Sequence, residues 1–226
     1  VPTEMKRMFD HHLRPILQAR FGLVPRKRHV LRCIGLPESV ANQRMSGYSF
    51  PGVVVGYRAA MPEVHVKLEF APDAETEAPL EEARRRLGKE IFGVDCGPLE
   101  EVVGELLKER GQTVAVAESC TSGRLAAALT VKAGASAYFL GGALVYSNAE
   151  KQRAAGVDGE VLAEKGAVSE EVARMLAEGI RSRVGSDWGI GVTGIAGPDG
   201  GSPEKPVGTV HIAVAGPEGT RHRALL

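Results

Sequence analysis

The 226-residue chain lacks several features that mark common protein classes. Its three cysteines, Cys33, Cys96 and Cys120, are odd in number and show no pairing pattern, so we expect no disulfide framework and a reducing compartment. No stretch approaches the roughly 18 apolar residues of a membrane span, and no signal peptide is visible. These absences predict a cytoplasmic protein without a membrane partner.

An excess of one charge sign is also missing. Lys and Arg together number 28, as do Asp and Glu, and 43% of the residues are hydrophobic, so the composition is that of a globular protein long enough to form a core. The charges are nevertheless uneven, because residues 1–35 are basic and residues 63–109 are acidic. The chain begins at Val1 and ends at Leu226 inside a strand-like run, so we expect it to be cut at both ends.

The first block of the chain predicts a small α+β unit. Apolar residues recur every three or four positions over 3–21, which favours a helix. A proline turn at Met61-Pro62 separates two strand-like runs, and residues 64–70 alternate between apolar and polar side chains. The expected elements are strands at 30–34, 52–57 and 64–70, a helix at 80–91 and an exit segment at 93–98.

The second block, from Pro98 onward, alternates strands with helices. Ser147 with Glu150 three residues later has the pattern of a capping box, and Ser169 is placed to cap a further helix. The patterns predict strands at 113–117, 143–146, 188–192 and 207–214, and helices at 99–111, 122–131, 147–156 and from Ser169 onward. This alternation indicates a layered α/β domain.

The segment "AESCTSGR" (117–124) places several nucleophile-type side chains on one strand-to-helix turn. Unpaired N–H groups at the start of a helix favour anions, so a hydroxyl group there would lie beside a ready oxyanion hole. Capping by Ser119 and Thr121 explains the same residues equally well. Cys120 is better explained as a small buried residue than as a nucleophile.

A serine nucleophile needs a base, and residues 98–210 contain no histidine, so a Ser-His-Asp triad within this block is not expected. The segment "ALVYSNAEK" (143–151) offers Tyr146 at a strand end and Lys151 in the following helix. A lysine desolvated beside a serine can act as its base. From spacing alone, a solvated charge on a helix explains Lys151 better.

The segment "VTGIAGPDGGSPEKPVGT" (192–209) is rich in glycine and lies between two expected strands. Such a loop can bring the backbone close to a phosphate or a sugar. It matches neither the Walker pattern nor the dinucleotide fingerprint, so an ordinary long loop remains an alternative.

Four segments together resemble the CinA family over residues 98–226: "AESCTSGR", "GGALVYSNAEK", "GAVSEEVARMLAEG" and "VTGIAGPDGGSPEKPVGTV". The resemblance implies a three-layer α/β domain with a central sheet at 98–226. It implies a small α+β KH-like domain at 25–97. Residues 1–24 resemble the tail of a preceding molybdopterin-binding-like domain and its connecting helix. That domain, linked in the family to ADP-ribose pyrophosphatase activity, is absent here, as is a later "F-x-G-x-R" segment.

The same resemblance implies a nicotinamide-nucleotide amidase, which hydrolyses nicotinamide mononucleotide to nicotinate mononucleotide and ammonia. It implies no metal or organic cofactor, and a homodimer is expected. Ser119 matches the nucleophile, Lys151 the base, and Tyr146 and Thr193 supporting polar groups. The expected substrate contacts are Glu118, Thr121, Gly123, Asn148, Gly194, Gly197, Gly200 and Gly201. Ser122 is a departure, because the family usually has glycine there.

Two alternatives remain open. The basic segment Arg26–Arg32 suggests a KH-like nucleic-acid-binding or scaffold module, although no G-x-x-G loop follows the strand at 30–34 and aromatic residues make up only 5% of the chain. The other alternative is a catalytically silent amidase domain that lacks its C-terminal segment.

Overall fold

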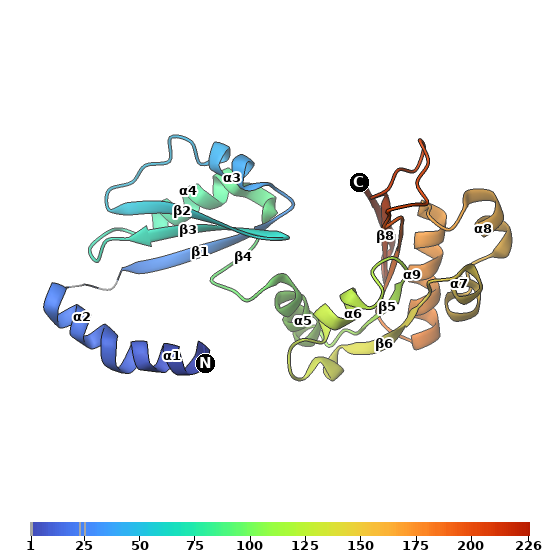
Figure 1. Ribbon diagram of the computed structural model, residues 1–226, viewed down its shortest axis with the longest axis horizontal. Coiled ribbons are helices and arrows are strands. Elements are labelled where there is room, and N and C mark those ends of the chain that lie inside the picture. Colours follow the sequence, from blue (N-terminus) through green and yellow to red (C-terminus); the bar gives the residue numbers. More distant parts are fainter. Residues whose placement is uncertain (1, 23, 25) are drawn as a thin grey trace. The chain divides into compact units, whose positions relative to one another are not determined.

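The computed structural model describes residues 2–22, 24 and 26–226, and it divides into two compact units, Val1–Gly97 and Pro98–Leu226 (Figure 1). Each unit forms its own sheet, and the mixed α/β character expected from the sequence is confirmed. Within the described residues, no helix is long and apolar enough to cross a membrane.

The first unit begins with a continuous helical segment, as expected over residues 3–21. It consists of α1 (Pro2–Met8), a π-helical turn η1 (Phe9–Leu13) and α2 (Arg14–Phe21). The segment ends at Gly22, whose φ of 59° lies in the left-handed region that favours glycine.

The rest of this unit is a four-stranded antiparallel sheet with two helices. Its elements are β1 (Lys27–Ile34), α3 (Glu38–Arg44), β2 (Val53–Ala60), β3 (Glu63–Phe70), α4 (Glu77–Leu87), the short 3₁₀ helix η2 (Gly88–Glu90) and β4 (Ile91–Val94). The strand order β2-β3-β1-β4 and the βαββαβ sequence are those of the ferredoxin-like split βαβ motif.

The small α+β unit is therefore confirmed. It differs from the sequence prediction at residues 91–94, which were expected partly as the end of a helix and partly as an exit segment. They pair with β1 instead and form the fourth strand, because Gly88 ends α4 earlier than the sequence pattern predicted. Helix α3 was not anticipated.

A buried polar cluster lies on this sheet. Arg32 on β1 donates to Glu63 Oε2 from Nε at 2.8 Å, and His65 Nε2 lies 2.8 Å from the same oxygen. Arg32 also donates to the carbonyl of Cys96 at 3.0 Å. These bonds explain why His65 is buried, although the alternation along residues 64–70 predicted that it faces solvent.

The second unit contains a five-stranded sheet with helices on both faces. Its elements are α5 (Leu99–Glu109), β5 (Val114–Glu118), α6 (Arg124–Leu129), η3 (Ala135–Ala137), β6 (Phe139–Leu144), α7 (Asn148–Ala155), α8 (Gly159–Lys165), α9 (Glu170–Val184), β7 (Trp188–Gly194), β8 (Val210–Gly216) and β9 (Gly219–Leu225). The strand order is β6-β5-β7-β8-β9. Strand β5 pairs in parallel with β6 and β7, and the last three strands are antiparallel.

Alternate residues of the central strand β5 serve the two helical layers. Val114 and Val116 pack in the same apolar cluster as Leu107 of α5 and Leu129 of α6. Ala115 and Ala117 pack on the other face, with residues of α7, α8 and α9. Successive side chains of a strand point to opposite faces, so β5 contacts the helices on both sides of the sheet in the layered arrangement of Figure 1.

Helix α9 packs directly against the backbone of its neighbours at two glycines. A Cβ atom at Gly191 of β7 would overlap the carbonyl oxygen of Ala173 on α9, and one at Gly179 of α9 would overlap the carbonyl oxygen of Ala155 on α7. Strand β7, helix α9 and helix α7 are therefore packed with no room for a side chain at these two points.

Candidate active site

The turn after β5 continues the alternation of the strand. Glu118 follows Val114 and Val116 at steps of two residues, so its side chain points to the same face of the sheet, toward α6. The side chain of Ser119 points to the opposite face, toward the layer that contains α7. The backbone on both sides is fixed, because Ser119 N–H donates to the carbonyl of Val192 at 3.0 Å and the carbonyl of Glu118 accepts from Val145 N–H at 2.8 Å. The turn thus starts from the middle of three parallel strands, at their carboxyl edge.

Ser119 and Lys151 meet at this edge. Lys151 Nζ lies 3.2 Å from Ser119 Oγ, although 32 residues separate them in the chain. Ser119 is 7% exposed and Lys151 only 2%. Helix α7 carries the lysine, and Ser147 caps that helix as expected by accepting from Glu150 N–H. The alternative of a solvated helix charge at Lys151 is wrong, because α7 packs against α9 with this side chain inside.

The Lys151 amine is buried among uncharged hydrogen-bond acceptors. Nζ donates to the carbonyls of Val145 at 2.9 Å and of Tyr146 at 3.2 Å, and no carboxylate forms an ion pair with it among the described residues. Burial lowers the pKa of Lys151. In the structure Nζ also donates to Ser119 Oγ, and on losing one proton the amine would keep two hydrogens for the two carbonyl groups and turn its lone pair to the hydroxyl group of Ser119.

Neither Ser119 nor Thr121 caps helix α6. The helix begins after Gly123, which has no side chain to bond the first turn, and Thr121 Oγ1 is buried without a hydrogen-bond partner within the described residues. The capping explanation of these hydroxyl groups is therefore wrong. The N–H groups at the helix start were also expected to be free for an anion, but Glu118 occupies them: its carboxylate accepts from Gly123, Leu125 and Ala126 at 2.8–3.0 Å.

Cys120 is half-buried beside Ser119. Burial raises the pKa of its thiol, and the backbone N–H groups of Cys120 and Thr121 and the amine of Lys151 offset this only in part. A thiol with a raised pKa is a poor nucleophile. The N–H groups of Cys120 and Thr121, which are directed at the Cys120 thiol, have no backbone acceptor in the described part of the chain.

Ser119 and Lys151 open into a pocket of about 300 Å³. Its walls come from the turn after β5, the start of α7, the segment before α9 and the glycine-rich loop after β7. The lining residues are Ser119, Cys120, Tyr146, Asn148, Lys151, Ala167, Val168, Thr193, Gly194, Ile195, Ala196, Gly197, Asp199 and Gly200.

A serine, a buried amine and a glycine-rich wall therefore line one pocket. The model of the family described as "CinA C-terminal domain" matches residues 97–226. The chain belongs to the CinA family. The CinA-like protein of Anaeromyxobacter dehalogenans (strain 2CP-C) is 46% identical over 97% of this chain and 55% of that protein, and that of Synechocystis sp. is 41% identical over 100% and 56%. The chain thus spans little more than half the length of these CinA relatives.

Solved structures match the fold of somewhat more than half of the chain. The competence/damage inducible protein CihA from Agrobacterium tumefaciens is 42% identical, with a TM-score of 0.55 over 56% of this chain and 77% of that one. The competence damage-inducible protein A from Klebsiella pneumoniae is 37% identical, with a TM-score of 0.54 over 56% and 79%.

Eight of the twelve residues expected at the site line the pocket of this CinA protein, and four do not. Those on the wall are Ser119, Tyr146, Asn148, Lys151, Thr193, Gly194, Gly197 and Gly200. Those away from it are Glu118, Thr121, Gly123 and Gly201. Six further residues line it without having been expected there, although each lies within a segment that resembles the family: Cys120, Ala167, Val168, Ile195, Ala196 and Asp199.

Thr193 and Tyr146 support the pocket in different ways. Thr193 is 1% exposed, and its hydroxyl donates to the carbonyl of Ala167 at 2.7 Å, which fastens the segment before α9 to the end of β7. Tyr146 is 75% exposed. It contributes to the site through its backbone carbonyl, which accepts a hydrogen bond from Lys151 Nζ.

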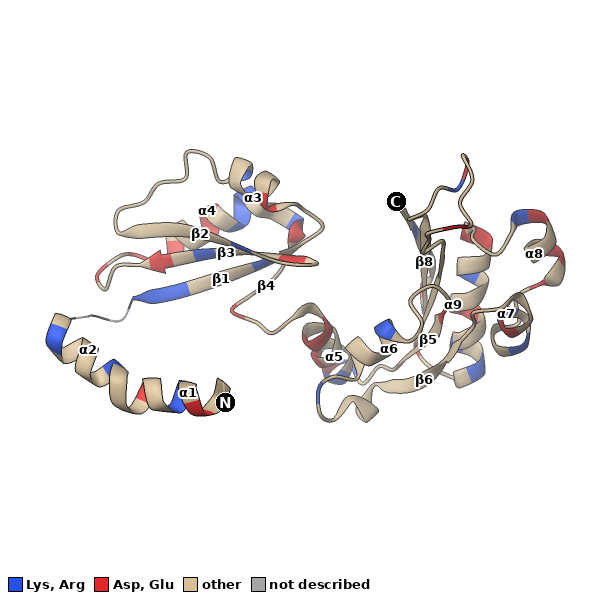
Figure 2. Ribbon diagram, viewed as in Figure 1, with Lys and Arg blue, Asp and Glu red and all other residues tan. Residues whose placement is uncertain are grey.

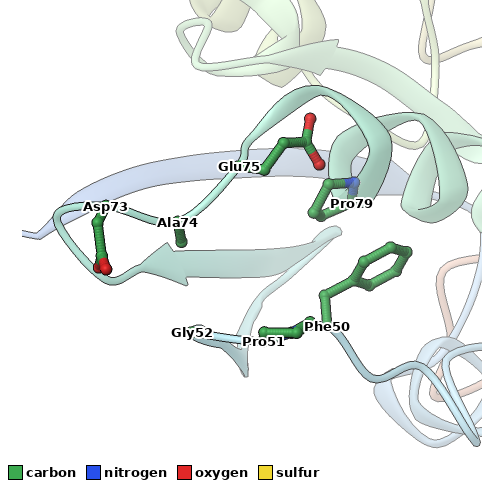
Figure 3. Close-up of a pocket in the computed structure, with 7 residues that line it drawn as sticks. All are labelled: Phe50, Pro51, Gly52, Asp73, Ala74, Glu75 and Pro79. Atoms are coloured by element: carbon green, nitrogen blue, oxygen red, sulfur yellow. The ribbon is translucent and has the colours of Figure 1, made fainter.

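The described pockets of the first unit do not place a buried amine beside a hydroxyl group. One cavity of about 290 Å³ has Asp73 and Glu75 as its titratable lining residues (Figure 3). A larger one of about 620 Å³ is lined in part by Glu82, Arg85 and Arg86, which form ion pairs with one another on α4. Basic residues gather at the exposed start of β1 (Figure 2), but within the expected basic segment Arg32 is held by Glu63. The described residues contain no group of three His, Cys, Asp or Glu side chains that could bind a metal ion.

Proposed function

We propose that the Pro98–Leu226 unit is an amidase that hydrolyses the carboxamide of nicotinamide mononucleotide by a Ser-Lys mechanism. The observation that carries the chemistry is the buried Lys151 amine, 3.2 Å from Ser119 Oγ and bonded to two carbonyl groups. The substrate comes from the family resemblance, and the pocket with its glycine-rich wall has the kind of backbone surface that approaches sugar and phosphate groups closely.

In the first half of the reaction, Ser119 Oγ attacks the carboxamide carbon while its proton passes to Lys151 Nζ. The negative oxygen of the tetrahedral intermediate lies next to the turn that holds the N–H groups of Cys120 and Thr121. The C–N bond then breaks, the proton on Lys151 moves to the leaving nitrogen, and ammonia departs. An ester between the nicotinate carbonyl and Ser119 remains.

In the second half, Lys151 removes a proton from a water molecule as that water attacks the ester. The bond to Ser119 Oγ breaks, nicotinate mononucleotide leaves, and the proton returns to Ser119. Burial of Lys151 serves both halves, because lowering the pKa of its amine increases the fraction present as free base.

The test is to incubate the purified protein with nicotinamide mononucleotide and measure ammonia and nicotinate mononucleotide together. Equal amounts of both products are expected, and Ser119→Ala should form neither. Two matched substrates are nicotinamide riboside, which lacks the phosphate, and nicotinamide, which lacks the whole ribose phosphate. No product from the mononucleotide would reject the proposed substrate.

A further inference from the structure

The carboxyl group of Glu118 lies beside the nucleophile but is not in the pocket. Glu118 is fully buried, and its oxygens accept from three backbone N–H groups of α6: Gly123 at 3.0 Å, Leu125 at 3.0 Å and Ala126 at 2.8 Å. We propose that Glu118 is a positioning residue that holds Ser119 at its distance from Lys151. The proposal rests on the role of Ser119 as the nucleophile in the proposed function.

The contacts of Glu118 span the catalytic turn. The acceptor belongs to the last residue of β5, and its donors belong to the first turn of α6, so residues 119–122 lie between the two ends of these bonds. Helix α6 has only six residues, and its N-cap residue, Gly123, has no side chain to bond the first turn. A helix this short is not stable on its own, so the carboxylate of Glu118 supplies the cap from the preceding strand.

The turn needs such support, because its backbone is unfavourable for its sequence. Ser122 has a φ of 49°, in the left-handed region that side chains other than glycine avoid, and Gly123 follows with a φ of 90°. A residue held in this region costs free energy and persists only where its surroundings determine the conformation. The bonds from Glu118 to Gly123 and beyond supply that constraint on one side, and the bond from Ser119 N–H to Val192 supplies it on the other.

The arrangement also determines which donors face the substrate. Because Glu118 takes the N–H groups of the first helical turn, a substrate oxygen has the N–H groups of Cys120 and Thr121 left to it. A loosened turn would move Ser119 Oγ away from Lys151 and these two donors away from the developing charge at the same time. Both changes lower the rate of the chemical step rather than the affinity for the nucleotide.

The test compares Glu118→Gln with Asp187→Asn. Glutamine keeps the shape of the side chain but presents an NH₂ group to the N–H donors. Asp187 is the matched control, because its carboxylate accepts from Thr113 N–H and Oγ1, both at 2.8 Å, at the opposite end of the same strand region. We expect kcat to fall about 100-fold in Glu118→Gln, as for a small misplacement of a reacting group, with KM changed less than about threefold. Asp187→Asn should lower the melting temperature but leave kcat unchanged.

A second readout is independent of the nucleotide. A fluorophosphonate probe forms a bond from Ser119 Oγ to phosphorus while the P–F bond breaks, fluoride leaves and the serine proton goes to Lys151. The labelling rate, followed by intact mass, should fall in parallel with kcat in Glu118→Gln, with Ser119→Ala as the unlabelled control. Labelling of the native protein without turnover of the mononucleotide would reject the proposed substrate and leave the role of Glu118 measurable.

The possible outcomes separate positioning from folding. If the labelling rate and kcat of the Glu118→Gln variant equal those of the native protein, the proposal is overturned. A change in KM alone would also overturn it. If Glu118→Gln does not fold, Glu118→Asp is measured in its place, and a native labelling rate there overturns the proposal. If neither variant folds while Asp187→Asn does, Glu118 is a requirement of the fold and the proposal fails. Partial recovery of the labelling rate by adding Ser122→Gly, which removes the unfavourable φ at that residue, would support it.

Discussion

Each of the two units buries an ionisable side chain, but the partners of that side chain differ between the units. In the first unit, Glu63 accepts from the guanidinium of Arg32 and lies 2.8 Å from His65 Nε2, so its carboxylate has a positively charged partner. In the second unit, Lys151 is buried with carbonyl groups and the hydroxyl of Ser119, and no carboxylate pairs with it in the described ranges.

The contrast separates a structural use of burial from a chemical one. A buried ion pair keeps both groups charged and passive, whereas a buried amine without a counter-charge is pushed toward its neutral, basic form. Perturbed groups of the second kind gather at functional sites. The comparison therefore points to the second unit as the reactive one, and four experiments can break or sharpen it.

The largest expected effect is that of Ser119→Ala. Loss of the nucleophile should lower kcat by about four or more orders of magnitude, with little change in melting temperature, because Ser119 does not cap α6. Ammonia release and thermal unfolding measure the two quantities on the same preparation.

Two neighbouring variants are the controls. Cys120→Ala should stay active because its thiol is a poor nucleophile, and Thr121→Ala should keep its stability because Thr121 Oγ1 makes no hydrogen bond in the described structure. An active Ser119→Ala, or a folded but inactive Cys120→Ala, would show that another atom attacks the substrate.

Lys151→Met and Arg32→Met test the comparison directly. Removing the base should lower kcat by ~10²–10⁴, while an apolar side chain at a buried position without an ion pair should leave the free energy of unfolding unchanged or higher. Arg32→Met should leave kcat unchanged but lower the free energy of unfolding by about 3 kcal/mol, because it removes one partner of a buried pair. The opposite pattern would mean that Lys151 is structural.

A smaller effect is expected from pH. If Lys151 acts as the free base, kcat/KM should rise with pH to a plateau, with a midpoint below the ordinary lysine pKa of about 10.4. Because the folded pKa is lowered, the unfolded chain binds the proton more strongly, so the free energy of unfolding should rise with pH between the folded and unfolded pKa values. Lys151→Met should lose this rise, and a midpoint at or above the ordinary lysine value would contradict the assignment.

The smallest expected effect is that of chelation. The mechanism uses only Ser119, Lys151 and backbone donors, so turnover should be the same before and after dialysis against EDTA. Activity that disappears in EDTA and returns with one divalent ion would replace the Ser-Lys mechanism with a metal-assisted one.

Much of the site could be located from the sequence, because its residues lie in segments that resemble a family and at the ends of predictable elements. Ser147 and Ser169 cap α7 and α9 as their patterns predicted. The burial of Lys151 could not be predicted, since Asn148, Glu150 and Gln152 around it make the helix look solvated. It follows from the packing of α7 against α9, which no local pattern contains.

The role of Glu118 shows a different kind of error. The family resemblance implied a substrate contact for Glu118. Adjacent residues of a strand point to opposite faces, however, and this alternation turns the carboxylate toward α6. The start of strand β6 was predicted at residue 143, whereas the strand begins at Phe139. Glycines such as Gly141 and Gly142 are unusual inside a strand, which hid its first half. Here a glycine is required, because a Cβ at Gly142 would overlap the carbonyl oxygen of Val116.

The close packing of α9 has a consequence for how this sequence can vary. Any side chain at Gly179 or Gly191 would collide with backbone atoms of a neighbouring element, whereas Tyr146 and Asn148 on the pocket wall are exposed. In a saturation-mutagenesis library scored for folded protein, we expect nearly all substitutions at the two glycines to be depleted and most at Tyr146 and Asn148 to survive. Measured by mutational tolerance for folding, the most constrained part of the domain would then lie behind the active site and not within it.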